Sequence, residues 1–228
     1  MLGLNREQVA DMQAVSAVLP FKVNDYVLEQ LIDHGDLPHD PIFQLTFPQR
    51  GMLGEGDFKR MRDLVTRGAT DAELRLAADE IRATLNPHPA GQMELNKPHF
   101  GGDTLEGMQH KYNETVLFFP TQGQTCHAYC TYCFRWAQFI GDGDLKFASK
   151  EANQLVQYVS DNPEISSVLI TGGDPMVMKT KFLRNYIEPL LAIPHLNSIR
   201  IGTKALAYWP YRFTDGEDAD DFRRLIDD

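Results

Sequence analysis

Three cysteines, Cys126, Cys130 and Cys133, follow a C-x3-C-x2-C pattern and are the only cysteines in the 228 residues. Unrelated cysteines rarely gather in one short loop, so this spacing indicates a shared chemical role. Thiolates are soft ligands that favour iron–sulfur clusters or zinc. Three thiolates leave one coordination position open, where an unprotected iron of a cluster can bind a substrate or cosubstrate. An odd, clustered set also fits a metal site in a reducing compartment better than a disulfide framework.

A zinc knuckle is the alternative for these cysteines, with His127 or His110 as the fourth ligand. Zinc ligands usually come as two pairs separated by a spacer, and the sequence has no second cysteine pair. His127 also adjoins Cys126 directly, which makes tetrahedral closure difficult. We therefore favour a cluster over zinc.

Composition and charge narrow the class of protein. The net charge of -10 argues against a protein built mainly to bind nucleic acid. No apolar run approaches the roughly 20 residues that span a bilayer, and charges interrupt the N-terminus where a signal peptide needs its apolar core. We therefore expect a cytoplasmic protein with no membrane or nucleic-acid partner.

The first part of the chain has the pattern of a helical region. Apolar spacing predicts helices at Arg6–Val18, 24–35, 58–68 and 71–85, the last opened by a capping box at Thr70 and Glu73. Prolines and glycines predict an extended connection over residues 36–55. A second Pro/Gly-rich passage, which begins at residue 86, places the domain boundary near residue 105. The predicted domains are a helical N-terminal region, 1–105, and a core, 106–228.

The second part alternates strands and helices. Buried strands are predicted at 115–120 and 167–171, a third strand at 198–202, and helices at 150–160, 182–191 and 218–226. This order implies an α/β fold with parallel strands, whose ligands bind beyond the carboxyl ends of the strands. The cysteine loop, the Gly172-Gly173-Asp174 segment and Thr203-Lys204 each follow one of these ends. We therefore expect the three segments to converge on one face.

The cysteine loop resembles the signature of the radical S-adenosylmethionine (SAM) superfamily, including the aromatic Tyr132 before the last cysteine. In that superfamily the loop holds a 4Fe-4S cluster whose fourth iron chelates SAM. Gly172, Gly173 and Asp174 match a segment that binds the amino group of SAM there. By itself such a segment is most often a plain turn, but glycines permit close approach and a carboxylate suits an ammonium.

A closer resemblance is to lysine 2,3-aminomutase and its relatives, and it covers nearly all of the chain. The matching segments are 21–26, 40–43, 107–112, 126–135, 171–175, 199–203 and 210–214. This resemblance implies a partial radical-SAM parallel (β/α) barrel preceded by the helical region. It also implies SAM and pyridoxal 5′-phosphate (PLP) as cofactors, an external reductant such as flavodoxin or ferredoxin, and a 1,2-shift of an amino group on an amino acid.

Individual roles follow from the same resemblance. Arg135 matches an arginine that grips the substrate carboxylate, for which a guanidinium fork is suited. Lys111 and Tyr112 fall where the family has a pair close to PLP, and Thr203 lies in the family's Arg-Ile-Gly-Thr segment. The alternative for Arg135 is a surface salt bridge. The alternative for Lys111 and Tyr112 is an ordinary charged loop before a strand.

The catalytic PLP lysine is not assigned, because family members continue beyond residue 228 and only three barrel strands are expected here. We therefore expect a truncated chain. Lys204 is the nearest substitute for that lysine, although a solvated loop lysine is the simpler interpretation. The alternatives for function are an aminomutase for another amino acid or a protein-bound lysine, and an inactive metal-binding fragment. A homo-oligomer is compatible with each of these.

Overall fold

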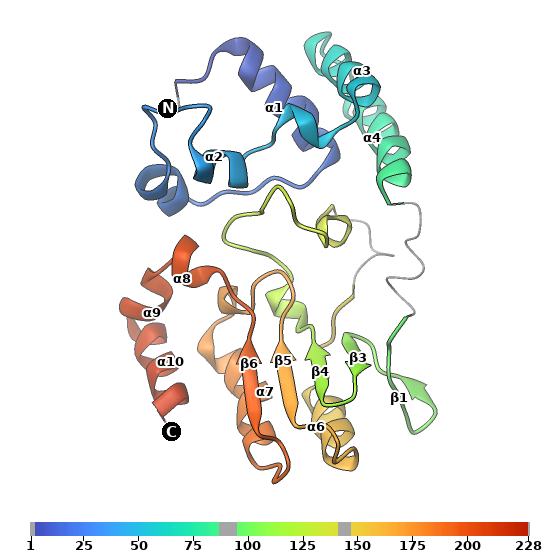
Figure 1. Cartoon of the computed structure of the whole chain (residues 1–228), viewed down its shortest axis with the longest axis vertical. Helices are drawn as coiled ribbons and strands as arrows, with labels where there is room; N and C mark the ends of the chain where they lie inside the picture. Colours follow the sequence, from blue (N-terminus) through green and yellow to red (C-terminus); the bar gives the residue numbers. More distant parts are fainter. Residues whose placement is uncertain (1–2, 87–94, 141–146, 228) are drawn as a thin grey trace. The chain divides into compact units, whose positions relative to one another are not determined.

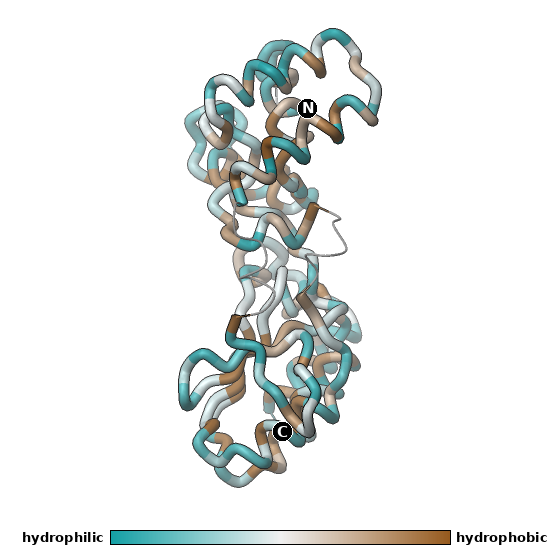
Figure 2. The backbone as a smooth tube through the Cα atoms, turned by 90° about the vertical axis from the view of Figure 1, so that its right-hand side faces the viewer, coloured by the Kyte–Doolittle hydropathy of each residue, from teal (hydrophilic) through white to brown (hydrophobic). Residues whose placement is uncertain are grey.

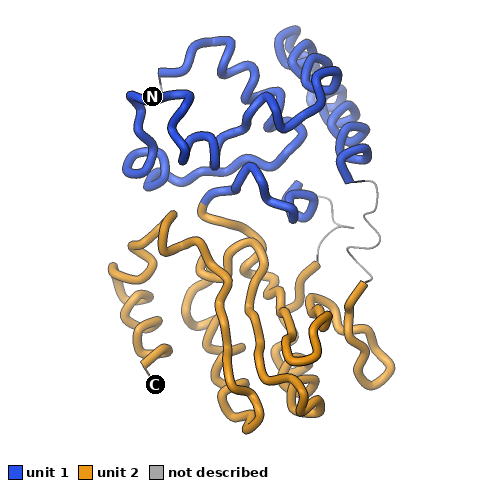
Figure 3. The backbone as a smooth tube through the Cα atoms, viewed as in Figure 1, with its two compact units in different colours: residues 1–89, 128–145 blue, residues 90–127, 146–228 orange. Residues whose placement is uncertain are grey.

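The computed structural model describes residues 3–86, 95–140 and 147–227, and the chain forms two compact units (Figure 3). Unit 1 comprises residues 1–89 and 128–145, and unit 2 comprises residues 90–127 and 146–228. Most of the Pro/Gly-rich passage predicted to separate the domains, residues 87–94, lies outside the described residues. The predicted domain limits, 1–105 and 106–228, stay a prediction, because a compact unit need not fold alone.

Unit 1 is helical, as the apolar spacing predicts. Its elements are α1 (Arg6–Val18), the π-helical turn η1 (Val27–Leu31), α2 (Pro41–Thr46), the 3-10 turn η2 (Arg50–Met52), α3 (Glu55–Thr66), α4 (Asp71–Leu85) and the 3-10 turn η4 (Trp136–Phe139). The bounds of α1 match the prediction. The predicted capping box of α4 is also present, since Thr70 Oγ1 accepts from the Glu73 amide while Glu73 accepts from the Thr70 amide.

Two predictions for unit 1 are wrong in detail. The predicted helix over residues 24–35 is shortened to a helical segment over residues 25–31 that ends with η1, and Asn24 caps it by accepting from the Val27 amide at 2.9 Å. Residues 36–55 are not simply extended, because they contain α2 and η2. Asp40 caps α2 by accepting from the Phe43 amide at 2.7 Å, and Pro41 occupies the first helical position, where its missing N–H costs nothing.

The core of unit 1 forms where α1, α3 and α4 pack together. Each helix contributes apolar side chains from one face, and these are almost completely buried. They are Ala14, Val15 and Val18 from α1, Phe58 and Met61 from α3, and Ala77, Ala78 and Ile81 from α4. Trp136 of η4, just after the cysteine motif, packs against this cluster. The end of the cysteine loop is therefore anchored to the helical core.

Unit 2 is built on a four-stranded sheet of order β3-β4-β5-β6 (Figure 1). Its strands are β3 (Met108–Tyr112), β4 (Thr115–Phe118), β5 (Ser167–Ile170) and β6 (Ser198–Ile201). The last three are parallel and pair Phe118 with Ile170 and Ile170 with Ile201, which confirms the predicted strands and their direction. β3 is an antiparallel edge strand that the sequence analysis missed.

The remaining elements of unit 2 are short strands and helices. They are β1 (His99–Phe100), β2 (Asp103–Thr104), the 3-10 turns η3 (Thr121–Gly123) and η6 (Pro175–Val177), and the helices α6 (Ala152–Asp161), α7 (Thr180–Leu191), α8 (Ala205–Tyr208), α9 (Tyr211–Thr214) and α10 (Glu217–Asp227). The predicted helices at 150–160, 182–191 and 218–226 correspond to α6, α7 and α10. The sequence analysis did not predict β1, β2, α8 or α9.

Helices α6 and α7 cover one face of this sheet (Figure 1). The buried side chains of β4 and β5 alternate along each strand, and they pack against Leu155 and Val159 of α6 and Leu183 of α7. This alternation leaves the intervening side chains, such as Leu117 and Leu169, on the other face. The structure therefore confirms a mixed α/β unit whose parallel strands are joined by crossover helices.

Hydrophilic and hydrophobic residues are interspersed along the described backbone (Figure 2). Among the helices of the described ranges, none has both the length and the apolar character needed to cross a membrane.

Candidate functional site

The segments that follow β4, β5 and β6 meet at the carboxyl edge of the unit 2 sheet. The turn after β5 donates from the Gly173 amide to Gly123 O at 3.0 Å and from the Asp174 amide to Thr125 O at 2.7 Å. Thr125 immediately precedes Cys126. The turn after β5 therefore holds the backbone that enters the cysteine motif.

Gly173 makes this close approach possible. A Cβ atom at this position would lie 2.4 Å from Thr125 O and 2.7 Å from Thr125 N, well inside van der Waals contact. Both atoms belong to the backbone and cannot rotate away. Gly172 has a positive φ of 154°, and its Cβ would lie 3.0 Å from Gly123 O. The two glycines thus let two backbone segments pack directly against each other.

The Asp174 carboxylate joins the turn after β5 to the segment after β6. Its Oδ1 accepts from the Thr203 hydroxyl at 2.6 Å and from the Met176 amide at 2.9 Å, and its Oδ2 accepts from the Lys204 amide at 2.8 Å. Asp174 is only 3% exposed. A carboxylate offers about four acceptor positions, so these three donors leave it room for about one more. The structure therefore brings Asp174 and Thr203 together, as expected for two residues of one site.

The cysteine motif crosses the division between the units. Cys126 belongs to unit 2, whereas Cys130 and Cys133 belong to unit 1. Each of the three is half-buried, and none forms a disulfide. Within unit 1 the Cys133 amide donates to Cys130 O at 3.0 Å, so a tight turn separates these two residues. In the described part of the chain, no group of three or more His, Cys, Asp or Glu side chains is arranged to hold a metal ion.

A cavity of ≈ 300 Å³ lies in unit 1 beside two of the cysteines. Cys130 and Cys133 line it together with Leu19, Met52 and Trp136, so its wall is mainly apolar. Two of the three predicted cluster ligands therefore border one cavity that is large enough for a small group.

Tyr132 and Arg135 lie on the same loop in unit 1. Tyr132 is 65% exposed, so its ring is open to solvent. The Arg135 guanidinium donates to Oε1 of Gln138 and lies 5.9 Å from the centre of the Phe139 ring. These contacts orient a half-buried guanidinium, which is consistent with either a binding role or a structural one.

Lys111 and Tyr112 are not placed with Asp174. They end β3, and because β3 runs antiparallel to β4, Tyr112 pairs with Thr115 at the amino end of β4. The Asp174 turn lies at the carboxyl end of the parallel strands. Both residues are exposed, and the Lys111 ammonium lies 5.6 Å from the centre of the Tyr112 ring. Their predicted contact with PLP gains no support from this position.

The two histidines considered as zinc ligands have other contacts in unit 2. His110 Nε2 lies 3.1 Å from Asn113 O, and Nδ1 lies 2.7 Å from the Tyr158 hydroxyl. Because a carbonyl only accepts, Nε2 carries the proton and Nδ1 accepts from Tyr158. The ring of His127 stacks on Trp209, with 6.5 Å between centroids. His110 would have to give up these hydrogen bonds to bind zinc, which weakens the zinc alternative.

One polar residue near this edge was missed by the sequence analysis. Arg212 of α9 is almost buried and donates to the carbonyl oxygens of Met176 and Met178, directly after the Asp174 turn. Its position in the family-like segment 210–214 was the available signal. Its partners could not be read from the sequence, because they lie more than 30 positions away along the chain.

Comparisons with known proteins give one consistent family. No protein-family model matches the sequence. The chain is 31% identical to the L-lysine 2,3-aminomutase of Clostridium subterminale over 93% of its own length and 42% of the relative. It is 38% identical to the L-lysine 2,3-aminomutase of Bacillus subtilis (strain 168) over 49% of the chain and 23% of that relative. It is 36% identical to the glutamate 2,3-aminomutase of Clostridioides difficile (strain 630) over 40% of the chain and 21% of that relative. The chain thus spans less than half the length of each of these curated relatives.

Proposed function

Because the chain belongs to the lysine 2,3-aminomutase family, we propose that it acts in a radical SAM reaction that shifts an amino group between adjacent carbons of an amino acid. We propose an amino acid as the substrate without naming which one, since the relatives include both lysine and glutamate aminomutases. We further propose that the parallel strands β4, β5 and β6 are the first strands of a radical-SAM barrel, preceded by the helical region. An external reductant such as flavodoxin or ferredoxin would supply the electron.

The observation that carries this proposal is the direct packing of the Asp174 turn against the residues that lead into Cys126. The turn after β5 and the start of the cysteine motif share two short backbone hydrogen bonds, and Gly173 permits no side chain between them. A carboxylate with one remaining acceptor position therefore lies beside the start of a thiolate-rich loop. This arrangement suits a cosubstrate that carries an ammonium group and also binds iron.

The donor set fits a 4Fe-4S cluster. Cys126, Cys130 and Cys133 are soft donors outside any disulfide, and the last two line a cavity. The chemistry that such a cluster would supply when bound is one-electron reduction of SAM, which would be cleaved to give a carbon radical. The thiolates of the three cysteines would hold the iron, and the Asp174 carboxylate would bind the SAM ammonium. Tyr132, Gly172, Gly173 and Thr203 would support the same binding site.

The roles of Arg135 and PLP rest on the family resemblance. The Arg135 guanidinium, oriented by Gln138, would pair with the substrate carboxylate through two parallel hydrogen bonds. PLP is implied by the family resemblance, but Lys111 and Tyr112 lie at the opposite edge of the sheet from Asp174. These residues do not fit one site with Asp174, so we derive no step through PLP.

Anaerobic reconstitution with iron and sulfide tests the proposal. We expect about four iron and four sulfide per chain, and formation of 5′-deoxyadenosine from SAM when a reductant is added. Cys130→Ala should abolish both results. Thr131→Ala is the matched control, because it changes the same loop and removes a methyl group and a hydroxyl, which donates to Gln44 O at 3.2 Å, but no thiolate. Uptake of one zinc with no iron would contradict the proposal and favour the zinc alternative.

A further inference from the structure

The guanidinium of Arg212 in α9 donates hydrogen bonds to backbone and side-chain oxygens from all three of its nitrogens. Nε donates to Met176 O at 3.1 Å, and a terminal nitrogen donates to Met178 O at 3.3 Å and to the Thr180 hydroxyl at 3.0 Å. The other terminal nitrogen pairs with the Asp218 carboxylate at 3.0 Å. The Arg212 side chain is only 8% exposed, whereas the Asp218 side chain is 43% exposed, so the bonds to Met176 and Met178 are the more shielded from water.

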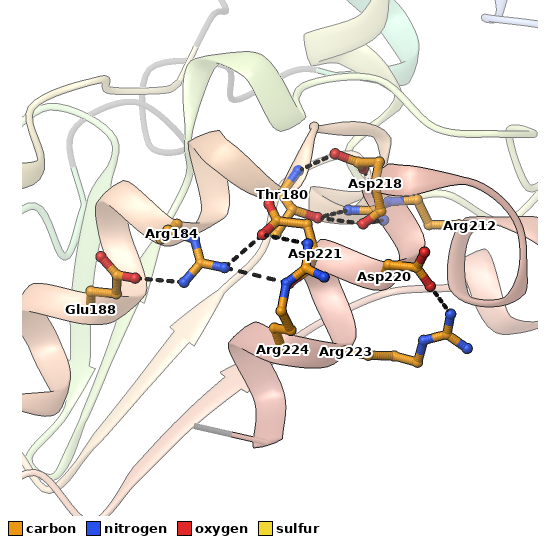
Figure 4. Close-up of polar contacts among 9 residues, drawn as sticks. All are labelled: Thr180, Arg184, Glu188, Arg212, Asp218, Asp220, Asp221, Arg223 and Arg224. Carbon is orange, nitrogen blue, oxygen red and sulfur yellow. Dashed lines mark hydrogen bonds and ion pairs between the residues drawn. The ribbon is translucent and has the colours of Figure 1, made fainter.

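Hydrogen bonds in the same cluster connect Thr180, the first residue of α7, to Asp218 in helix α10 (Figure 4). The Thr180 amide donates to the Asp218 carboxylate at 3.0 Å, and the Thr180 hydroxyl donates to Asp218 O at 3.0 Å. Burial lowers the pKa of the Arg212 guanidinium, whereas the carboxylates of Asp218 and Asp221 act in the opposite direction. A buried cation of this kind needs its partners to offset the cost of removing its charge from water.

The 3-10 turn η6 lies between Arg212 and Asp174. Asp174 caps the amino end of η6 through the Met176 amide, and Arg212 binds the carbonyl oxygens of Met176 and Met178 at its carboxyl end. Carbonyl groups at the end of a helical turn have no partner within the turn. The segment after β6 thus holds both ends of η6, since Thr203 and Arg212 both follow β6.

We propose that Arg212 is a positioning residue that fixes η6 and thereby orients the Asp174 carboxylate. A displacement of η6 would move Asp174. It would shift the Asp174 amide, which donates to Thr125 O, and the Asp174 carboxylate, which accepts from the Thr203 hydroxyl. The effect of Arg212 on SAM rests on the proposed function, whereas its effect on the turn does not.

Hydrogen exchange of the backbone amides tests the positioning in the metal-free chain. In Arg212→Met we expect the amides of Gly173, Asp174 and Lys204 to exchange at least tenfold faster, while the amides of β4 and β5 keep their rates. Arg212→Lys keeps the charge and part of the hydrogen bonding, so it should restore part of the protection. If Arg212→Met does not fold, the exchange rates of Arg212→Lys still test whether Arg212 positions the Asp174 turn.

Arg184→Met is the matched control. Arg184 is also partly buried and also pairs with an α10 carboxylate, that of Asp221 at 2.8 Å, and it bonds Glu188 on its own helix. The partners drawn for Arg184 in Figure 4, Glu188 and Asp221, belong to α7 and α10 and not to η6. This variant should leave the three amides unchanged. Equal acceleration of all amides, or no acceleration in either Arg212 variant, would overturn the positioning role.

The dissociation constant for SAM on the reconstituted chain gives the second measurement. We expect at least tenfold weaker binding for Arg212→Met at unchanged iron content, an intermediate value for Arg212→Lys, and a value within twofold of native for Arg184→Met. Native-like affinity in both Arg212 variants would overturn the link to SAM. If the native chain binds no SAM, the proposed function fails, and hydrogen exchange still decides whether Arg212 positions the turn.

Discussion

Replacing Gly173 with alanine tests the close packing beneath the candidate site. The added methyl group would lie 2.4 Å from Thr125 O, 2.6 Å from Thr125 C and 2.7 Å from Thr125 N. Because all three atoms belong to the backbone, the two segments must separate. Separation would break the hydrogen bonds from the amides of Gly173 and Asp174 to Gly123 O and Thr125 O.

The expected cost combines two effects. Overpacking a tightly packed site typically costs about 1–3 kcal/mol, and each lost hydrogen bond costs about 1 kcal/mol. Alanine also restricts the unfolded chain, which offsets about 0.4–1 kcal/mol. We therefore expect Gly173→Ala to lower the free energy of unfolding by about 2–4 kcal/mol. For a chain of this size that corresponds to a drop in Tm of about 4–16 °C.

Urea denaturation followed by tryptophan fluorescence measures this loss of stability, provided that the signal comes from unit 2, to which Gly173 belongs. The chain has two tryptophans, so a Trp136→Phe background leaves Trp209 as the reporter in unit 2. Gly202→Ala is the control at the same sheet edge, because its nearest neighbour is the movable Thr171 hydroxyl at 3.3 Å. We expect it to cost less than about 1 kcal/mol. The reasoning is refuted if Gly173→Ala costs no more than Gly202→Ala.

Three further predictions concern caps and polar contacts. Thr70→Ala should lower the free energy of unfolding by about 1 kcal/mol in urea denaturation, because it removes the N-cap of α4, and an unchanged value would contradict the cap. Hydrogen bonds from Thr70 hold the pKa of Glu73 below its ordinary value, so its stabilising effect is present above that value and lost as pH falls through the lowered pKa. In Glu73→Gln the free energy of unfolding should therefore fall less steeply as the pH is lowered through the acid range. The same pH dependence in the variant and the native chain would contradict this prediction. Tyr158→Phe should lower the free energy of unfolding by about 1 kcal/mol in urea denaturation, because it removes the hydroxyl that donates to His110 Nδ1, and an unchanged value would contradict this hydrogen bond.

Local signals explain which elements the sequence predicts well. The spacing of Val9, Met12, Val15 and Val18 defines α1, because one apolar stripe is enough to determine an amphipathic helix. The strands β4, β5 and β6 were also found from short apolar runs between turn residues. In α1 the burial follows this pattern only in part, because Val15 and Val18 are buried whereas Val9 is 40% exposed, and β6 has no fully buried residue.

Elements that depend on distant contacts were missed. β3 has the sequence Met-Gln-His-Lys-Tyr, without clear alternation, and becomes a strand because it pairs with β4. α2 is short and follows several prolines, so Asp40 and Pro41 were interpreted as part of a connection, although together they form a cap and a first helical position.

The candidate site was predictable in outline but not in its contacts. Parallel strands bring their carboxyl ends to one edge, so the meeting of the Asp174 turn, Thr203 and the start of the cysteine loop followed from strand order. The number of donors that bind the Asp174 carboxylate and the role of Arg212 depend on side-chain positions in the folded chain. The same is true of Lys111 and Tyr112, whose place at the opposite edge follows from the antiparallel pairing of β3.

The order of the sheet has a consequence for association between chains. In the described residues β6 pairs only with β5, so one side of its backbone offers N–H and C=O groups to any further strand. Exposed edges of this kind promote strand addition, and a charged side chain such as that of Arg200 is a common protection against it. A barrel built from this unit would have to extend at β6. In a preparation without such a strand, we expect β6, like β3 at the other edge of the sheet, to be open to strand addition from a second chain.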